Sequence, residues 1–176
     1  ARIYAEQCRN YWCSDECLQK CTRMKHSEYF KKTIPCLLDK LTLDHKPKFG
    51  LMTPQHMLEH LIWVTKATAK DKGPAPEELT KSQQGFMSFI DKGAIFKYRP
   101  SDKTEEDLPP LKYASFEEAK QNVPTAIERL SSFLEDRSSN VFNPMMGDLT
   151  PDGLATFHFM HYKWHLEEQY GLSVED

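Results

Sequence analysis

Apolar residues recur at three- and four-residue spacing along much of this 176-residue chain, which is the spacing of one face of an α-helix. The pattern is mostly helical from about Tyr4 to Leu41. Pro35 lies inside it and predicts a break or bend before Leu37, because proline cannot donate a helical hydrogen bond. The apolar stripe of this segment consists of Tyr29, Phe30, Ile34, Leu37, Leu38 and Leu41.

Thr-Pro pairs mark the starts of two further helices. Thr53 is expected to cap a helix with Pro54 in its first position, running to about Ala69. Thr150 begins the last helix in the same way, and Gly171 is expected to end it in a left-handed conformation. Both helices carry apolar residues on the face that we expect to be buried.

The middle of the chain is less regular. Residues 70–80 contain a glycine and two prolines and predict a loop. A short helix is expected over 82–90 and a brief extended piece over 94–98. The polar linker 100–110 follows, and a long insertion of this kind usually covers a site or stays mobile.

Ser115 and Glu118 form a capping box that begins another helix, expected to run to about Asp136 with a kink at Pro124. A turn is predicted over 143–147, before the last helix. Four principal helices with neither convincing alternating strands nor an internal repeat predict an all-α protein. An antiparallel four-helix bundle is the architecture that this pattern favours.

Two histidine pairs at helical spacing are the main chemical signal. His56 and His60 lie in the helix that begins at Thr53, and His161 and His165 lie in the last helix. Residues four apart share a helix face, so each pair can present two imidazoles to a common point. His158 lies along the same face as the second pair. Neutral imidazole is the commonest protein ligand for a transition metal, so the pattern predicts a metal site inside the chain.

A second interpretation stays open, because a histidine on a core-facing helix is often only hydrogen bonded. Two pairs about a hundred residues apart, each after the same Thr-Pro helix start, favour the metal over that reading.

Charge and hydropathy exclude two classes of partner. Lys and Arg number 23 against 26 Asp and Glu, with both signs interspersed, so no basic stripe for nucleic acid is present. Apolar runs are far shorter than the ~20 residues that cross a bilayer. The sequence therefore predicts a soluble protein, either cytoplasmic or organellar after processing. The first residue is Ala1, with neither an initiator Met nor an apolar signal core, which is typical of a processed form or a trimmed piece.

All five cysteines fall within the first 36 residues. Their spacing does not match the Cys-x-x-Cys pairs of zinc modules. Cysteines four apart on a helix are poorly oriented to bridge each other, so disulfides to other segments and free thiols are equally open. The cysteines are Cys8, Cys13, Cys17, Cys21 and Cys36.

Several short motifs occur together in a characteristic order. They are Thr-Pro-Gln-His-Met-Leu-Glu-His-Leu at 53–61, Leu-Pro-Pro-Leu-Lys-Tyr at 108–113, Asn-Pro-Met-Met-Gly-Asp-Leu-Thr at 143–150 and Phe-His-Phe-Met-His-Tyr-Lys-Trp-His-Leu at 157–166. Over about residues 29–172 the chain resembles the DinB/YfiT-like superfamily, and within it an uncharacterised branch. The resemblance implies a four-helix bundle that binds a divalent metal.

The resemblance implies His60, His161 and His165 as the metal ligands. His56 stands where relatives more often have Gln, and we expect it to be a non-ligand. The stretch after His165 is one residue longer than the usual arrangement, which leaves the role of Gln169 open. Residues 1–26 have no counterpart in the resemblance and are expected to be a cysteine-rich extension of a domain over 27–176.

The resemblance also implies a function, because relatives include thiol-dependent transferases and hydrolase-like proteins. We therefore expect a metal-dependent hydrolase or thiol-dependent transferase of a small substrate, with zinc or nickel favoured over iron, manganese or copper, although imidazole suits several of these metals. Glu59, Glu167 and Glu168 are candidate bases, but a solvated helix face explains them better.

Two alternatives remain. The chain could be a non-catalytic accessory subunit of a larger assembly, or a homodimer, that keeps the fold for contacts. It could also be a module that binds a small molecule without turnover, in a pocket lined by Trp63, Phe157 and Trp164.

Overall fold

The computed structural model describes residues 26–98, 100 and 102–175. This part of the chain is mainly helical with one small hairpin, so the predicted all-α class is confirmed. The helical elements are η1 (Tyr29–Thr33), α3 (Ile34–Lys40), α4 (Pro54–Thr68), α5 (Lys81–Asp91), η2 (Glu105–Asp107), α6 (Phe116–Leu134), α7 (Pro151–Lys163) and η3 (Trp164–Gln169), and the strands are β1 (Val141–Asn143) and β2 (Gly147–Leu149).

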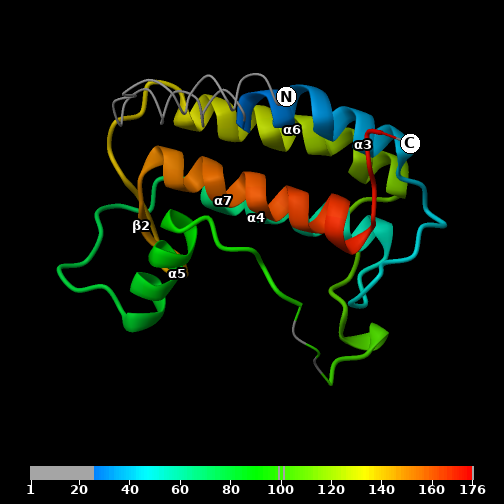
Figure 1. Ribbon diagram of the computed structural model, residues 1–176, viewed down its shortest axis with the longest axis horizontal. Helices are drawn as coiled ribbons and strands as arrows, with labels where there is room; N and C mark the ends of the chain where they lie inside the picture. The colour runs from blue at the N-terminus through cyan, green and yellow to red at the C-terminus, as the bar shows by residue number, and fades with distance from the viewer. Residues whose placement is uncertain (1–25, 99, 101, 176) are drawn as a thin grey trace, which may run out of the picture.

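The helix made of η1 and α3, and helices α4, α6 and α7, follow the long axis of the molecule (Figure 1). Helix α4 packs against both α6 and α7, and α5 packs against α7 and β2 at one end of α7. By the colours of Figure 1, α3 and α7 run in one direction, while α4 and α6 run in the other. The long segment between α4 and α6 allows this, because it returns the chain to the end of the molecule where α4 begins.

Pro35 does not break the first helix, so the predicted break is wrong. Helical conformation is continuous from His26 to Lys40, and Pro35 lies in the first turn of α3. The turns just before it are wider than α-helical ones, since the backbone N–H of Ile34 donates to the carbonyl of Tyr29, five residues earlier. Helix α6 likewise continues through Pro124, which lies on its exposed side.

The predicted helix starts are confirmed by their caps. Each N-cap hydroxyl accepts a hydrogen bond from the backbone N–H three residues later. The pairs are Thr53 with His56, Ser115 with Glu118 and Thr150 with Gly153. The short helix expected over 82–90 is confirmed as α5, itself begun by a capping box. Gly171 adopts φ +69°, the left-handed conformation expected after the last helix.

A two-stranded hairpin stands where only a turn was predicted. Strands β1 and β2 are antiparallel, with Asn143 opposite Gly147, and Gly147 has φ +89°. Three-residue strands are too short to show a period of two, which is why the pattern did not reveal them. Residues 94–98, expected to be extended, form no strand.

The main core lies between the long helices. Fully buried side chains from α3, α4, α6 and η3 meet there, among them Leu37, Leu58, Val123 and Leu166. A second cluster joins α5, the hairpin and the first turns of α7. None of the described helices has both the length and the apolar character that a membrane span requires.

The expected extension over 1–26 lies almost entirely outside the described residues, as do Cys8, Cys13, Cys17 and Cys21. Cys36 is exposed on α3 and forms no disulfide within the described part of the chain.

Candidate metal centre

The structure brings together the three histidines named from the sequence. His60 projects from the middle of α4, His161 from α7 and His165 from η3. The Nε2 atom of His161 lies 3.0 Å from Nε2 of His60 and 3.2 Å from Nε2 of His165. One ring nitrogen of each residue lies within 4.8 Å of the others, so the group could hold a metal ion.

These separations fit a shared cation. Two nitrogens bound at 2.0–2.1 Å to a tetrahedral ion lie roughly 3.3 Å apart, close to both measured distances. Hydrogen bonding alone explains the cluster less well. Nε2 of His161 has two close nitrogen neighbours but carries at most one proton, so it can donate only one hydrogen bond. Nδ1 of His161 is buried and has no hydrogen-bond partner among the described residues. Three nitrogens that converge on one point are what a metal requires.

Gln169 fixes the orientation and the tautomer of His165. Its Nε2 donates to the backbone carbonyl of Phe49 at 3.0 Å, a contact that only the amide nitrogen can make. The amide oxygen therefore faces His165, 2.7 Å from Nδ1, and must accept a hydrogen bond from the Nδ1–H group. With the proton on Nδ1, the lone pair of Nε2 points into the cluster. A metal-ligating histidine is commonly held in this way.

Burial keeps the cluster uncharged. His161 and His165 are 7% and 5% exposed. Desolvation lowers the pKa of His165 to about 4, lowers that of His60, and lowers that of His161 well below its ordinary value, with repulsion from neighbouring histidines adding to the shift. At neutral pH all three imidazoles are therefore neutral, which is the form that binds a metal.

Aromatic rings enclose the cluster on one side. Phe157 stacks on His161 with centroids 5.3 Å apart and an interplanar angle of 15°, and Phe96 approaches the same ring at 6.2 Å. These rings offer no ligand atoms, and they cover the His161 side of the cluster. A further ligand of a bound ion would therefore approach from the His60 side.

The two remaining histidines of these helices do not join the group. His56 lies one turn before His60, with its Nδ1 2.7 Å from the Thr53 hydroxyl, as expected of a non-ligand. His158 is fully buried, and its Nε2 lies 2.7 Å from the hydroxyl of Thr68. Burial lowers the pKa of His158 to about 3. His158 thus connects α7 to the end of α4.

Glu59 is neither a solvated residue nor a free base. Its carboxylate accepts the backbone N–H groups of Lys112 and Tyr113 at 2.7 and 3.1 Å. Gln55 donates to the same carboxylate at 3.1 Å and to the Tyr113 carbonyl at 2.9 Å. The residue next to a metal-ligand candidate therefore anchors the segment that precedes α6. The sequence gives no signal for this, since the partners are backbone amides 53 and 54 positions away.

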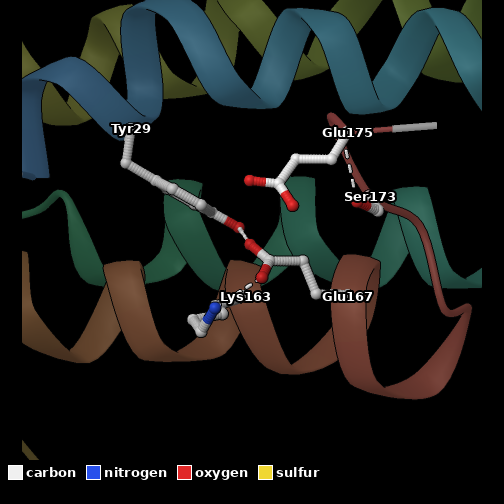
Figure 2. A network of polar contacts seen from close by, with 5 residues as sticks. All are labelled: Tyr29, Lys163, Glu167, Ser173 and Glu175. Carbon is white, nitrogen blue, oxygen red and sulfur yellow. Dashed lines mark hydrogen bonds and ion pairs between the residues drawn. The ribbon is translucent and has the colours of Figure 1, made fainter. Parts of the chain in front are cut away.

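Glu167 and Glu168 are not placed for catalysis at the cluster. Glu167 accepts a hydrogen bond from the Tyr29 hydroxyl at 2.8 Å and pairs with Lys163, and Figure 2 shows it between η3 and η1. Positions two apart on a helix point in nearly opposite directions, so Glu167 faces away from the side that His165 occupies. Glu168 is exposed.

A cleft of about 510 Å³ opens over His60. Its walls include His56, Glu59, Trp63 and Tyr98, and residues between 103 and 112, most of them in the predicted linker 100–110, cover one side. The sequence predicted that this insertion either covers a site or stays mobile, and the structure places it over the cleft. Trp63 lines the cleft as predicted, but Phe157 and Trp164 do not. Trp164 packs against Phe49 instead, at 4.9 Å.

Comparison of the chain with protein-family models, with curated proteins and with solved structures found no match in any of the three. The resemblance to the DinB/YfiT-like superfamily therefore stays a prediction.

Proposed function

We propose that this protein binds one divalent transition metal through His60, His161 and His165 and uses it on a small molecule held in the cleft. The observation that carries the proposal is the convergence of three Nε2 atoms from two separate helices, with Gln169 orienting one of them. We also propose that the four long helices form a four-helix bundle of the DinB/YfiT-like type, in which α4 and α7 carry the site.

The neighbourhood supports a reactive centre over a purely structural one. A structural zinc site is closed by four protein ligands, whereas three ligands from the protein leave a position for another molecule. Here the described residues supply three, and the cleft reaches His60. A bound divalent ion would supply Lewis acidity, the chemistry that hydrolysis or thiol transfer needs.

The residues of the chain have separate tasks in this proposal. His60, His161 and His165 hold the ion, Gln169 keeps the Nδ1 proton of His165 in place, and Phe157 covers one face of the His161 ring. Glu59 holds the linker against α4, which shapes the cleft wall. Zinc and nickel suit an all-imidazole site best, and iron, manganese and copper follow.

The alternative, a non-catalytic accessory subunit that keeps the metal or only the fold, predicts no small-molecule ligand in the cleft. The open cleft beside His60 favours the first function.

Calorimetric titration of the chelator-treated, dialysed protein with zinc tests the metal proposal. We expect one ion per chain for the unaltered protein and for His56→Ala, and loss of that binding in His161→Ala. His56→Ala is a matched control, because it removes a histidine of the same cleft, one turn from His60 on the same helix. Equal binding by both variants, or none by the unaltered protein, would overturn the assignment.

A further inference from the structure

The face of α4 beyond Trp63 carries a second recessed surface. A pocket of about 210 Å³ adjoins the cleft, and the two share Glu59, Trp63 and Lys112 in their walls. Residues of α4 at three- and four-residue spacing line the cleft, namely His56, His60 and Trp63. A neighbouring row with the same spacing, Glu59, Trp63 and Lys66, lines the second pocket. Trp63 thus stands at the boundary of both and is 55% exposed, an unusual position for so large an apolar side chain.

The charges around this double pocket are unbalanced. Four lysines line it against two carboxylates, whereas the chain as a whole carries a net charge of −3. The two carboxylates, Glu59 and Asp107, both accept backbone N–H groups, the second from Thr104 at 2.7 Å. The lysines are Lys66, Lys70, Lys103 and Lys112.

The lysines beyond Trp63 form no ion pair with the described residues, although the Glu59 carboxylate lines the same pocket. Within the described part of the chain, the ammonium groups of Lys70 and Lys112 have neither a hydrogen bond nor an ion pair. Lys66 donates only to the neutral hydroxyl of Tyr113, at 3.3 Å. An anion placed here would meet several cations beside the flat face of an indole ring.

We infer that the substrate of the proposed metal centre is an amphiphilic anion. Its flat or apolar body lies on Trp63, its reactive end reaches toward His60, and its anionic group, a carboxylate, sulfonate or phosphate, lies beyond Trp63 near Lys66, Lys70 and Lys112. This inference rests on the proposed function for the identity of the reactive end. The anion preference itself depends only on the pocket.

Fluorescence titration with two matched probes tests the inference. Anilinonaphthalenesulfonate and phenylnaphthylamine share an aromatic body, and only the first carries an anionic group. We expect the folded protein to bind the sulfonate about tenfold more tightly than the neutral probe, and Lys70→Gln/Lys112→Gln to reduce that advantage about five- to tenfold. Lys31→Gln, on the exposed side of η1, is the matched control and should change nothing.

Trp63→Ala should weaken both probes alike, because it removes the shared aromatic surface. Equal affinity for the two probes, no binding of either, or an equal effect of the Lys31 and Lys70/Lys112 variants would overturn the inference. Titrations with and without zinc separate the two proposals. Anion preference without zinc uptake leaves the anion site standing but removes the metal function and the reactive end assigned to the substrate, and zinc uptake without anion preference does the reverse.

Discussion

The side-chain oxygen of Gln169 lies 2.7 Å from Nδ1 of His165, and this contact determines which nitrogen of the imidazole faces the cluster. The amide has no freedom to turn, because its nitrogen donates to the Phe49 carbonyl. The loop around Phe49 is thereby connected to the candidate metal centre through one side chain.

Replacing Gln169 by Met should weaken zinc binding without unfolding the protein. Methionine has a similar length but is a poor acceptor for a hydrogen bond from Nδ1–H, so His165 loses its fixed tautomer. Outer partners of this kind are worth about 10- to 100-fold in metal affinity. Competition with a chromophoric chelator measures the change. Gln84→Met, on the exposed side of α5, is the control, and an equal loss in both variants would contradict the role given to Gln169.

Replacing Glu59 by Ala should loosen the linker while zinc stoichiometry stays the same. The backbone N–H groups of Lys112 and Tyr113 lose their acceptors and turn to water instead, at a cost of about 0.5–1.5 kcal/mol for each hydrogen bond. Their amide hydrogens should then exchange about 10- to 100-fold faster. Hydrogen exchange read by mass spectrometry over residues 103–113 tests this. Unchanged exchange there would show that Glu59 does not anchor the linker.

The stability of the metal-free protein should fall as the pH drops below about 6.5, the ordinary pKa of histidine. Burial lowers the pKa of His158 to about 3 and that of His165 to about 4. Between these values and pH 6.5 the unfolded chain takes up protons that the folded chain does not. The free energy of unfolding should therefore decrease by about 1.4 kcal/mol per pH unit for each such histidine.

Urea unfolding between pH 8 and pH 5 measures this slope. His158→Phe should reduce the slope by about one histidine's contribution. Saturating zinc should flatten the curve near neutral pH, because the ion binds the neutral imidazoles of the folded state. A slope that His158→Phe does not alter would show that His158 is not held neutral by burial.

Thr65 and Tyr162 should be energetically coupled across α4 and α7. Both are fully buried, and their hydroxyl oxygens lie 3.1 Å apart. Thr65→Val leaves the buried Tyr162 hydroxyl without a hydrogen-bond partner, and Tyr162→Phe does the same to the Thr65 hydroxyl. Each substitution should lower the free energy of unfolding by about 1–3 kcal/mol. The double variant should lose clearly less than the sum of the two, because it removes both partners. Additive losses in urea unfolding would contradict the hydrogen bond.

Local signals in the sequence predicted most of the helices and the clustering of the three histidines. The Thr-Pro starts and the Ser115 N-cap reproduce the observed helix beginnings, since caps depend on a few adjacent residues. The reciprocal half of the predicted capping box differs, because the Glu118 carboxylate accepts from the backbone N–H of Ala114 instead of Ser115. Helical spacing also placed His60, His161 and His165 on inward faces. The wide turns before Pro35 and after Lys163 were not predicted, because they depend on how the helices pack.

Contacts between residues far apart in the chain could not be predicted from the sequence. The attachment of Glu59 to the amides of Lys112 and Tyr113, and that of Gln169 to Phe49, join segments more than fifty positions apart. One residue of each pair contributes only backbone, so no side-chain pattern marks it. The course of the linker over the cleft likewise follows from these tertiary contacts.

Anomalous X-ray diffraction at the zinc edge, from crystals of the zinc-loaded protein, tests the central claim most directly. We expect a single strong peak with Nε2 of His60, His161 and His165 each at about 2.0–2.1 Å and an additional, non-protein ligand on the cleft side. A peak at any other position, or no peak between these three rings at saturating zinc, would contradict the account.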